Sequence, residues 1–112
     1  MKRNKLIDNI INYMINNEYE NSVILKEQYD NSKFELDEDK TGFNLFLVEY
    51  KGNLKTSKDD YEINTIGGKY NDLDIGFTIF IRSGILDEID GYTYGDIDFP
   101  DSDDIELYDV TL

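Results

Sequence analysis

Apolar side chains near the start of the chain recur at three- and four-residue intervals, the spacing of one face of a helix. The positions that follow this spacing are Leu6, Ile7, Ile10, Ile11, Met14 and Ile15. Asparagine and aspartate occupy the opposite side. The pattern predicts an amphipathic helix over residues 3–17 and a second, shorter helical segment through residues 23–28. We expect both apolar stripes to cover one face of a sheet.

From residue 32 onward the apolar period changes to two, the period of a half-buried strand. The strands that this period predicts are residues 32–36, 43–50, 61–65, 75–82, 85–94 and 105–110. The fourth of these is the richest in β-branched and aromatic side chains. One of its faces carries Phe77, Ile79 and Ile81, and the other carries Phe80. We therefore place this strand centrally in the sheet.

Two glycine-containing pairs predict turns. Ser83-Gly84 suits the tight turn of a hairpin between the fourth and fifth strands. Gly67-Gly68 is expected to end the third strand as a turn, since no phosphate-binding glycine-rich motif surrounds it.

Together these elements predict an α+β fold, with one or two N-terminal helices packed on an antiparallel β-sheet of four to six strands. A length of 112 residues with 39% apolar content suits one core, so we expect a single domain over residues 1–112. Residues 1–31 would form its helical segment and residues 32–112 its sheet.

Composition narrows the possible functions. A formal net charge of -14 repels phosphate backbones and anionic lipids, so we expect neither direct nucleic-acid binding nor a membrane partner. No apolar run approaches the roughly 18 residues that a membrane span needs, and we expect a cytoplasmic protein. The chain has neither Cys nor His, which removes disulfides, thiolate nucleophiles, imidazole bases and the usual transition-metal ligands. We expect no cofactor.

The acidic residues concentrate near the C-terminus, where residues 83–112 hold ten acids and no base. The cluster that begins at Asp96 invites a calcium-binding interpretation, because carboxylate oxygens are the ligands that calcium prefers. Its spacing departs from a calcium-binding EF-hand loop, since Asp101 stands where glycine is needed and Leu107 where a bidentate glutamate belongs. We expect no metal site, and either a solvated acidic loop or a partner surface.

Carboxylates at Asp87, Glu88 and Asp90 could in principle serve as an acid–base pair. With 25 acids in 112 residues, close carboxylate pairs arise by chance. We therefore expect that the protein is not an enzyme.

A C-terminal motif carries a resemblance to a known family. The stretch is Gly76-Phe77-Thr78-Ile79-Phe80-Ile81-Arg82-Ser83-Gly84-Ile85-Leu86-Asp87-Glu88-Ile89-Asp90-Gly91-Tyr92-Thr93-Tyr94-Gly95-Asp96, followed by Phe99-Pro100. It resembles a family of small uncharacterised bacterial proteins that share the pattern G-F-x-L-F-x-x-x-G-x-[IL]-x-x-[IL]-E-G-Y-T-Y-G. This chain departs from the pattern at Asp90, where the family has Glu, and at Phe99, where it has Trp. The resemblance implies a small α+β domain of the bacterial cytoplasm with no established activity, and we expect an immunity role.

The candidate partner-binding residues combine acids with two tyrosines of the last long strand. They are Asp87, Glu88, Asp90, Tyr92, Tyr94, Asp96, Asp98, Asp101, Asp103 and Asp104. Tyr92 and Tyr94 lie two apart and hence share a strand face, where they either pack against the sheet or form a contact surface.

These residues favour a small acidic binding protein, specifically an immunity protein that neutralises a bacterial toxin domain by direct occlusion. Its expected partner is a protein with a basic surface, which opposite charge would attract. The alternatives are a nucleic-acid mimic that inhibits a restriction or CRISPR nuclease, a structural or regulatory module, and a carboxylate-dependent enzyme.

Overall fold

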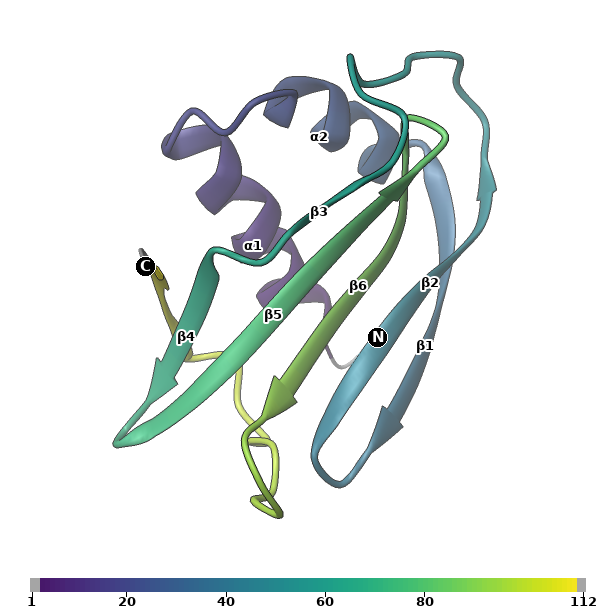
Figure 1. Ribbon diagram of the computed structural model, residues 1–112. Helices are drawn as coiled ribbons and strands as arrows, with labels where there is room; N and C mark the ends of the chain where they lie inside the picture. The colour runs from purple at the N-terminus through teal and green to yellow at the C-terminus, as the bar shows by residue number, and fades with distance from the viewer. Residues whose placement is uncertain (1–2, 111–112) are drawn as a thin grey trace.

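Two N-terminal helices lie across one face of an antiparallel sheet in the computed structural model, which describes residues 3–110 (Figure 1). Helix α1 spans Asn4–Asn16 and α2 spans Ser22–Asp30. The predicted apolar stripe of α1 is buried except at Ile15, which is partly exposed, and Leu6, Ile7, Ile10 and Met14 are each 0% exposed. The N-terminal helices are therefore held by the sheet, as the helical period predicts.

The strands are β1 Ser32–Asp39, β2 Gly42–Tyr50, β3 Tyr61–Ile63, β4 Ile66–Tyr70, β5 Leu73–Arg82, β6 Ile85–Thr93 and β7 Glu106–Asp109. All pairings are antiparallel, in the order β1-β2-β6-β5-β4-β7, and β3 pairs with β5 beside that path. This arrangement confirms the α+β fold. Its continuous path of six strands in residues 3–110 lies at the upper end of the predicted range, and β3 adds a seventh.

The core lies between the helices and the sheet. Phe77, Ile79 and Ile81 of β5 are at most 1% exposed and belong to the same apolar cluster as the buried side chains of α1. Strand β5 is central, with β6 on one edge and both β3 and β4 on the other. No helix within residues 3–110 is both long and apolar enough to span a membrane.

The prediction of a turn at Gly67-Gly68 is wrong, because both glycines lie inside β4 and pair with β5. A Cβ atom on Gly67 would come within 2.7 Å of a methyl carbon of Val110, and one on Gly68 within 2.6 Å of a methyl carbon of Ile105. Glycine at these positions lets the chain around β7 approach β4 closely. The break falls instead between β3 and β4, at residues 64–65.

Two buried polar side chains, those of Gln28 and Arg3, form hydrogen bonds with loops that connect the strands. The amide of Gln28, 0% exposed, donates from Nε2 to the carbonyl oxygens of Leu54 and Gly84 and accepts from the Leu86 N–H, each at 2.9 Å. These bonds hold α2 against the β5–β6 turn. At the other end of the sheet, the Arg3 guanidinium donates to the Pro100 carbonyl at 2.9 Å and so fixes the connection from β6 to β7.

Candidate functional site

The face of the sheet turned away from the helices is covered by no helix or strand of residues 3–110 (Figure 1). We call it the outer face. Successive side chains of a strand point to opposite sides, so the strand register decides which residues share it. Those residues are Lys33, Glu35, Asp37, Asp39, Asn44, Phe46, Glu62, Lys69, Asp74, Thr78, Phe80, Arg82, Glu88, Asp90, Tyr92, Tyr94, Glu106 and Tyr108.

One row across the outer face alternates carboxylates with aromatic rings. The register places Glu35 opposite Phe46 and Phe46 opposite Glu88. On the other side of β6, Glu88 stands opposite Phe80, and Phe80 opposite Glu62. Directly opposed side chains on one sheet face have Cβ atoms about 5 Å apart, so each ring lies between two carboxyl groups.

The next row is polar and hydrogen-bonded. The Asn44 side-chain amide donates to Asp90 Oδ1 at 2.6 Å, and the register places Asp37 and Thr78 on either side of this pair. The Thr78 hydroxyl lies 3.3 Å from the Tyr92 hydroxyl. These bonds fix the side chains at the centre of the outer face.

Glu88 and Asp90 are neighbours along β6 and share the outer face. Partial burial, the side-chain hydrogen bond with Asp90 and the negative charge of Asp90 raise the pKa of Glu88 from 4.5 to about 7, while Arg82 opposes this rise. Proximity of the two carboxyl groups therefore disfavours the charged form of Glu88. Within residues 3–110 no group of three or more His, Cys, Asp or Glu side chains is arranged to hold a metal ion.

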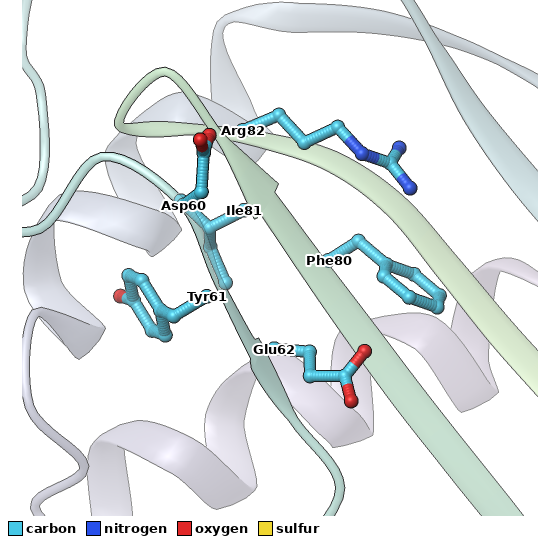
Figure 2. A pocket seen from close by; sticks show the side chains of 6 residues that line it. All are labelled: Asp60, Tyr61, Glu62, Phe80, Ile81 and Arg82. Carbon is cyan, nitrogen blue, oxygen red and sulfur yellow. The ribbon is translucent and has the colours of Figure 1, made fainter.

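Arg82 is the cation that lies beside Glu88 on the outer face. Its guanidinium lies 5.1 Å from the centre of the Phe80 ring, and Figure 2 shows both side chains on the same side of β5, with Glu62 beside them. A β-bulge at residue 87 of β6 turns two successive acids toward this guanidinium. Arg82 forms a hydrogen bond with Asp87 and lies 3.8 Å from Glu88 Oε1.

A shallow hollow of about 460 Å³ opens at this edge of the sheet, where β3 meets β5 (Figure 2). Its lining is Asp60, Tyr61, Glu62, Phe80, Ile81 and Arg82. The hollow lies at the β3 end of the row that alternates carboxylates with aromatic rings, next to Glu62 and Phe80. It adds contact area at that end of the outer face.

Tyr92, Tyr94 and Tyr108 occupy the far end of the outer face, next to Gly67 and Gly76. A Cβ atom on Gly76 would lie 2.4 Å from the ring of Tyr92, so the glycine lets that ring lie flat on β5. The rings of Tyr92 and Tyr94 meet edge to face at 5.8 Å. Tyr92 is half-buried, whereas Tyr94 is 59% exposed and Tyr108 is 37% exposed. Tyr92 therefore packs against the sheet, while the other two rings are open to contact.

The structure divides the predicted partner-binding residues into two groups. Asp87, Glu88, Asp90, Tyr92 and Tyr94 lie on the outer face or at its rim. Asp96, Asp98, Asp101, Asp103 and Asp104 lie in the connection from β6 to β7, which passes the end of the sheet on the helix side (Figure 1).

Contacts of the connection with the rest of the chain explain its position. Its Phe99 ring is buried and meets the ring of Phe43 edge to face at 5.6 Å. Asp98 lies 3.6 Å from the ammonium nitrogen of Lys40, in the β1–β2 turn. The acids of this connection therefore flank the outer face and do not form its centre.

The sequence analysis missed the residues that stand beside Glu88 and Asp90. They are Glu35, Asn44, Phe46, Glu62, Phe80 and Arg82. The period of two predicts Phe80 on the face opposite the core, so the sequence did hold a signal for this residue. Which strands lie on either side of β6 was not readable from the periodicity.

Comparisons of the chain with protein-family models, with curated proteins and with solved structures found no match.

Proposed function

We propose that the protein is a small inhibitor, an immunity protein that neutralises a bacterial toxin domain by covering a basic surface of that toxin with the outer face. One observation carries the proposal. Within residues 3–110, the three most exposed aromatic side chains are Phe46, Tyr94 and Tyr108, at 39%, 59% and 37%, and all lie on the outer face among carboxylates. Exposed aromatic rings rimmed by charge are typical of protein-binding surfaces.

The outer face offers two kinds of interaction to a basic protein. Its eight acids, against Lys33, Lys69 and Arg82, attract a positively charged surface and speed the encounter, with rates that can reach about 10⁸–10⁹ M⁻¹s⁻¹ at low salt. The net charge of -14 extends the same field over the whole molecule. The exposed rings would then anchor the complex and slow its dissociation, because buried aromatic side chains carry much of the binding energy at interfaces.

Inhibition would follow from the chemistry of a basic substrate-binding cleft on the partner. Enzymes that act on nucleic acids bind phosphates with Lys and Arg, so an acidic surface seated on such a cleft excludes the substrate. The mixed rows of rings and carboxylates favour a protein-specific contact over simple mimicry of a phosphate backbone. Folding of β6 into the middle of the sheet supports the contact by holding Glu88 and Asp90 rigidly.

The test combines capture with protection. The purified protein is used to capture a partner from the native host, the partner is identified by mass spectrometry, and its gene is expressed in a test bacterium with and without this protein. We expect growth arrest from the partner alone and normal growth when both are present. A partner that does not arrest growth would contradict the immunity proposal, and a restriction or CRISPR nuclease as partner would replace it by the mimic hypothesis.

Two variants with the same change in net charge test the place of contact. The outer-face variant combines Glu35→Gln, Asp37→Asn and Glu62→Gln, and the matched control combines Asp96→Asn, Asp98→Asn and Asp104→Asn. All six positions are exposed, so folding should survive in both variants. We expect the outer-face variant to associate more slowly and to show a weaker salt dependence than the control. A larger loss in the control would place the contact on the β6–β7 connection instead.

A further inference from the structure

The chain has two arginines, and both guanidinium groups stack on phenylalanine rings beside a glutamate. Arg3 lies 4.6 Å from the centre of the Phe99 ring, and its Nε donates to Glu38 Oε1 at 2.9 Å. Arg82 lies over Phe80, donates a hydrogen bond to the Asp87 carboxylate and lies 3.8 Å from Glu88 Oε1. The combination of ring and carboxyl group thus binds a guanidinium twice within this fold, through cation–π attraction and charge-assisted hydrogen bonds.

Phe46 has the same surroundings on the other side of β6. The register places Glu88 opposite it on β6 and Glu35 opposite it on β1. Phe46 is the most exposed of the six phenylalanines, at 39%. Within residues 3–110 no arginine or lysine lies over its ring, and Glu35 makes no ion pair.

The geometry points to a specific occupant. We propose that Phe46, between Glu35 and Glu88, is the binding site for an arginine side chain of the partner protein. This inference rests on the proposed function and names the chemistry that the partner must present. The charges favour this occupant, because Arg82 alone lies among four carboxyl groups, those of Glu35, Asp87, Glu88 and Asp90, and an incoming guanidinium would offset part of the remaining negative charge.

Arginine fits this site better than lysine does. The planar guanidinium stacks flat on a ring and still directs N–H groups outward in its plane, toward carboxylates on both sides. An ammonium group is more strongly hydrated and loses more on contact with the ring. Directly opposed side chains are about 5 Å apart at Cβ, and a cation within about 6 Å of a ring centre is attracted to it. A single guanidinium can therefore contact the ring and both glutamates at once.

The test uses two capped tripeptides, Gly-Arg-Gly and Gly-Lys-Gly, added to isotope-labelled protein and followed by NMR. We expect the shift changes produced by the arginine peptide to centre on Phe46 and its two opposed neighbours. Binding of the arginine peptide should exceed binding of the lysine peptide by about two- to fivefold, the gain expected from an exposed cation–π contact. Equal binding of both peptides, or shift changes that centre on Tyr94 and Tyr108, would overturn the site.

Variants with matched controls separate the ring from the charge. Phe46→Leu keeps an apolar side chain and removes the ring, and its control is Tyr108→Leu, at a ring of similar exposure. Glu35→Gln removes one carboxylate, and its control is Glu106→Gln on β7. We expect Phe46→Leu to abolish the preference for arginine and Glu35→Gln to weaken both peptides, while the controls bind as the wild type does. An unchanged preference in Phe46→Leu would refute the inference.

The captured partner distinguishes this inference from the proposed function. If Phe46→Leu binds the captured toxin with an unchanged dissociation rate and protects cells fully, the arginine site is wrong and the immunity function stands. If the captured partner does not arrest growth but the peptides bind at Phe46 with the expected preference, the site is right and the immunity function is wrong.

Discussion

Replacement of Glu88 by glutamine tests whether the centre of the outer face is under electrostatic strain. The side chain is 16% exposed, and burial together with the hydrogen bond and the charge of Asp90 raises its pKa from 4.5 to about 7. The folded protein therefore binds this proton more tightly than the unfolded chain does. The resulting contribution to stability is fully present below about pH 4.5 and is lost as the pH rises through about 7.

The size of the effect follows from the two pKa values. At about 1.4 kcal/mol for each unit of difference, a rise from 4.5 to about 7 sets an upper limit of about 3.4 kcal/mol. Solvent reaches part of the outer face and screens its charges, so we expect about 1–2 kcal/mol. Glutamine is neutral at every pH and can still donate a hydrogen bond to Asp90. Glu88→Gln should thus be more stable than the wild type by about 1–2 kcal/mol at pH 8 and nearly equal to it at pH 4.5.

Urea unfolding between pH 4.5 and pH 8 measures this difference. The control is Glu62→Gln, which removes one exposed acid from the same row and at pH 8 changes the net charge by nearly as much as Glu88→Gln does. At that pH, repulsion within a chain of net charge -14 is relieved to nearly the same extent in both variants, so the difference between them isolates the Glu88–Asp90 pair. Curves of wild type and Glu88→Gln that run parallel over this range would refute the reasoning.

Three further changes test the fold and the absence of a metal requirement. Ile79→Ala, at a fully buried site of β5, should lower the free energy of unfolding by about 2–5 kcal/mol, and an unchanged urea midpoint would contradict the placement of β5 in the core. Gln28→Leu leaves the Leu54 carbonyl oxygen and the Leu86 N–H group without their partner, while the Gly84 carbonyl keeps its bond from the Thr56 N–H, and the change should cost about 2–4 kcal/mol in the same assay, so a neutral effect would show that these bonds contribute nothing. Treatment with EDTA should leave the Tm unchanged, and a fall of several degrees that calcium reverses would reveal a metal site.

The sequence predicted the elements whose burial repeats at a fixed period. The stripe of α1 and the alternation of β5 each lie against one continuous apolar core, so composition at every third, fourth or second residue decides which side is inside. Phe77 and Phe80 are three residues apart on β5, so the alternation predicts that they point to opposite sides of the sheet. The structure buries Phe77 and leaves Phe80 on the outer face. Local periodicity is therefore enough to predict which face of a helix or strand lies in the core.

The same periodicity does not predict which strands pair with each other in the sheet. The outer-face row depends on β6 lying between β2 and β5, which brings Phe46 and Phe80 to opposite sides of Glu88. Gly67-Gly68 failed as a predicted turn for the same reason, since the close approach of β7 that demands glycine there comes from a segment far along the chain. The acids after residue 95 are close to Tyr92 and Tyr94 in sequence, but the buried ring of Phe99 packs on Phe43 and places their segment on the helix side of the sheet.

The placement of Glu88 links stability to the proposed function. A central strand needs no carboxyl group to fold, and threonine or glutamine would satisfy the same position without a raised pKa. Here the acid stands between two rings, beside Asp90, at a cost in stability that increases with pH. A cation from a partner would relieve that cost by favouring the charged carboxylate, so binding and deprotonation of Glu88 should favour each other. The variant that stabilises the free protein, Glu88→Gln, should therefore bind a basic partner less tightly, and the affinity of the wild type should rise between pH 6 and pH 8 while that of the variant stays level.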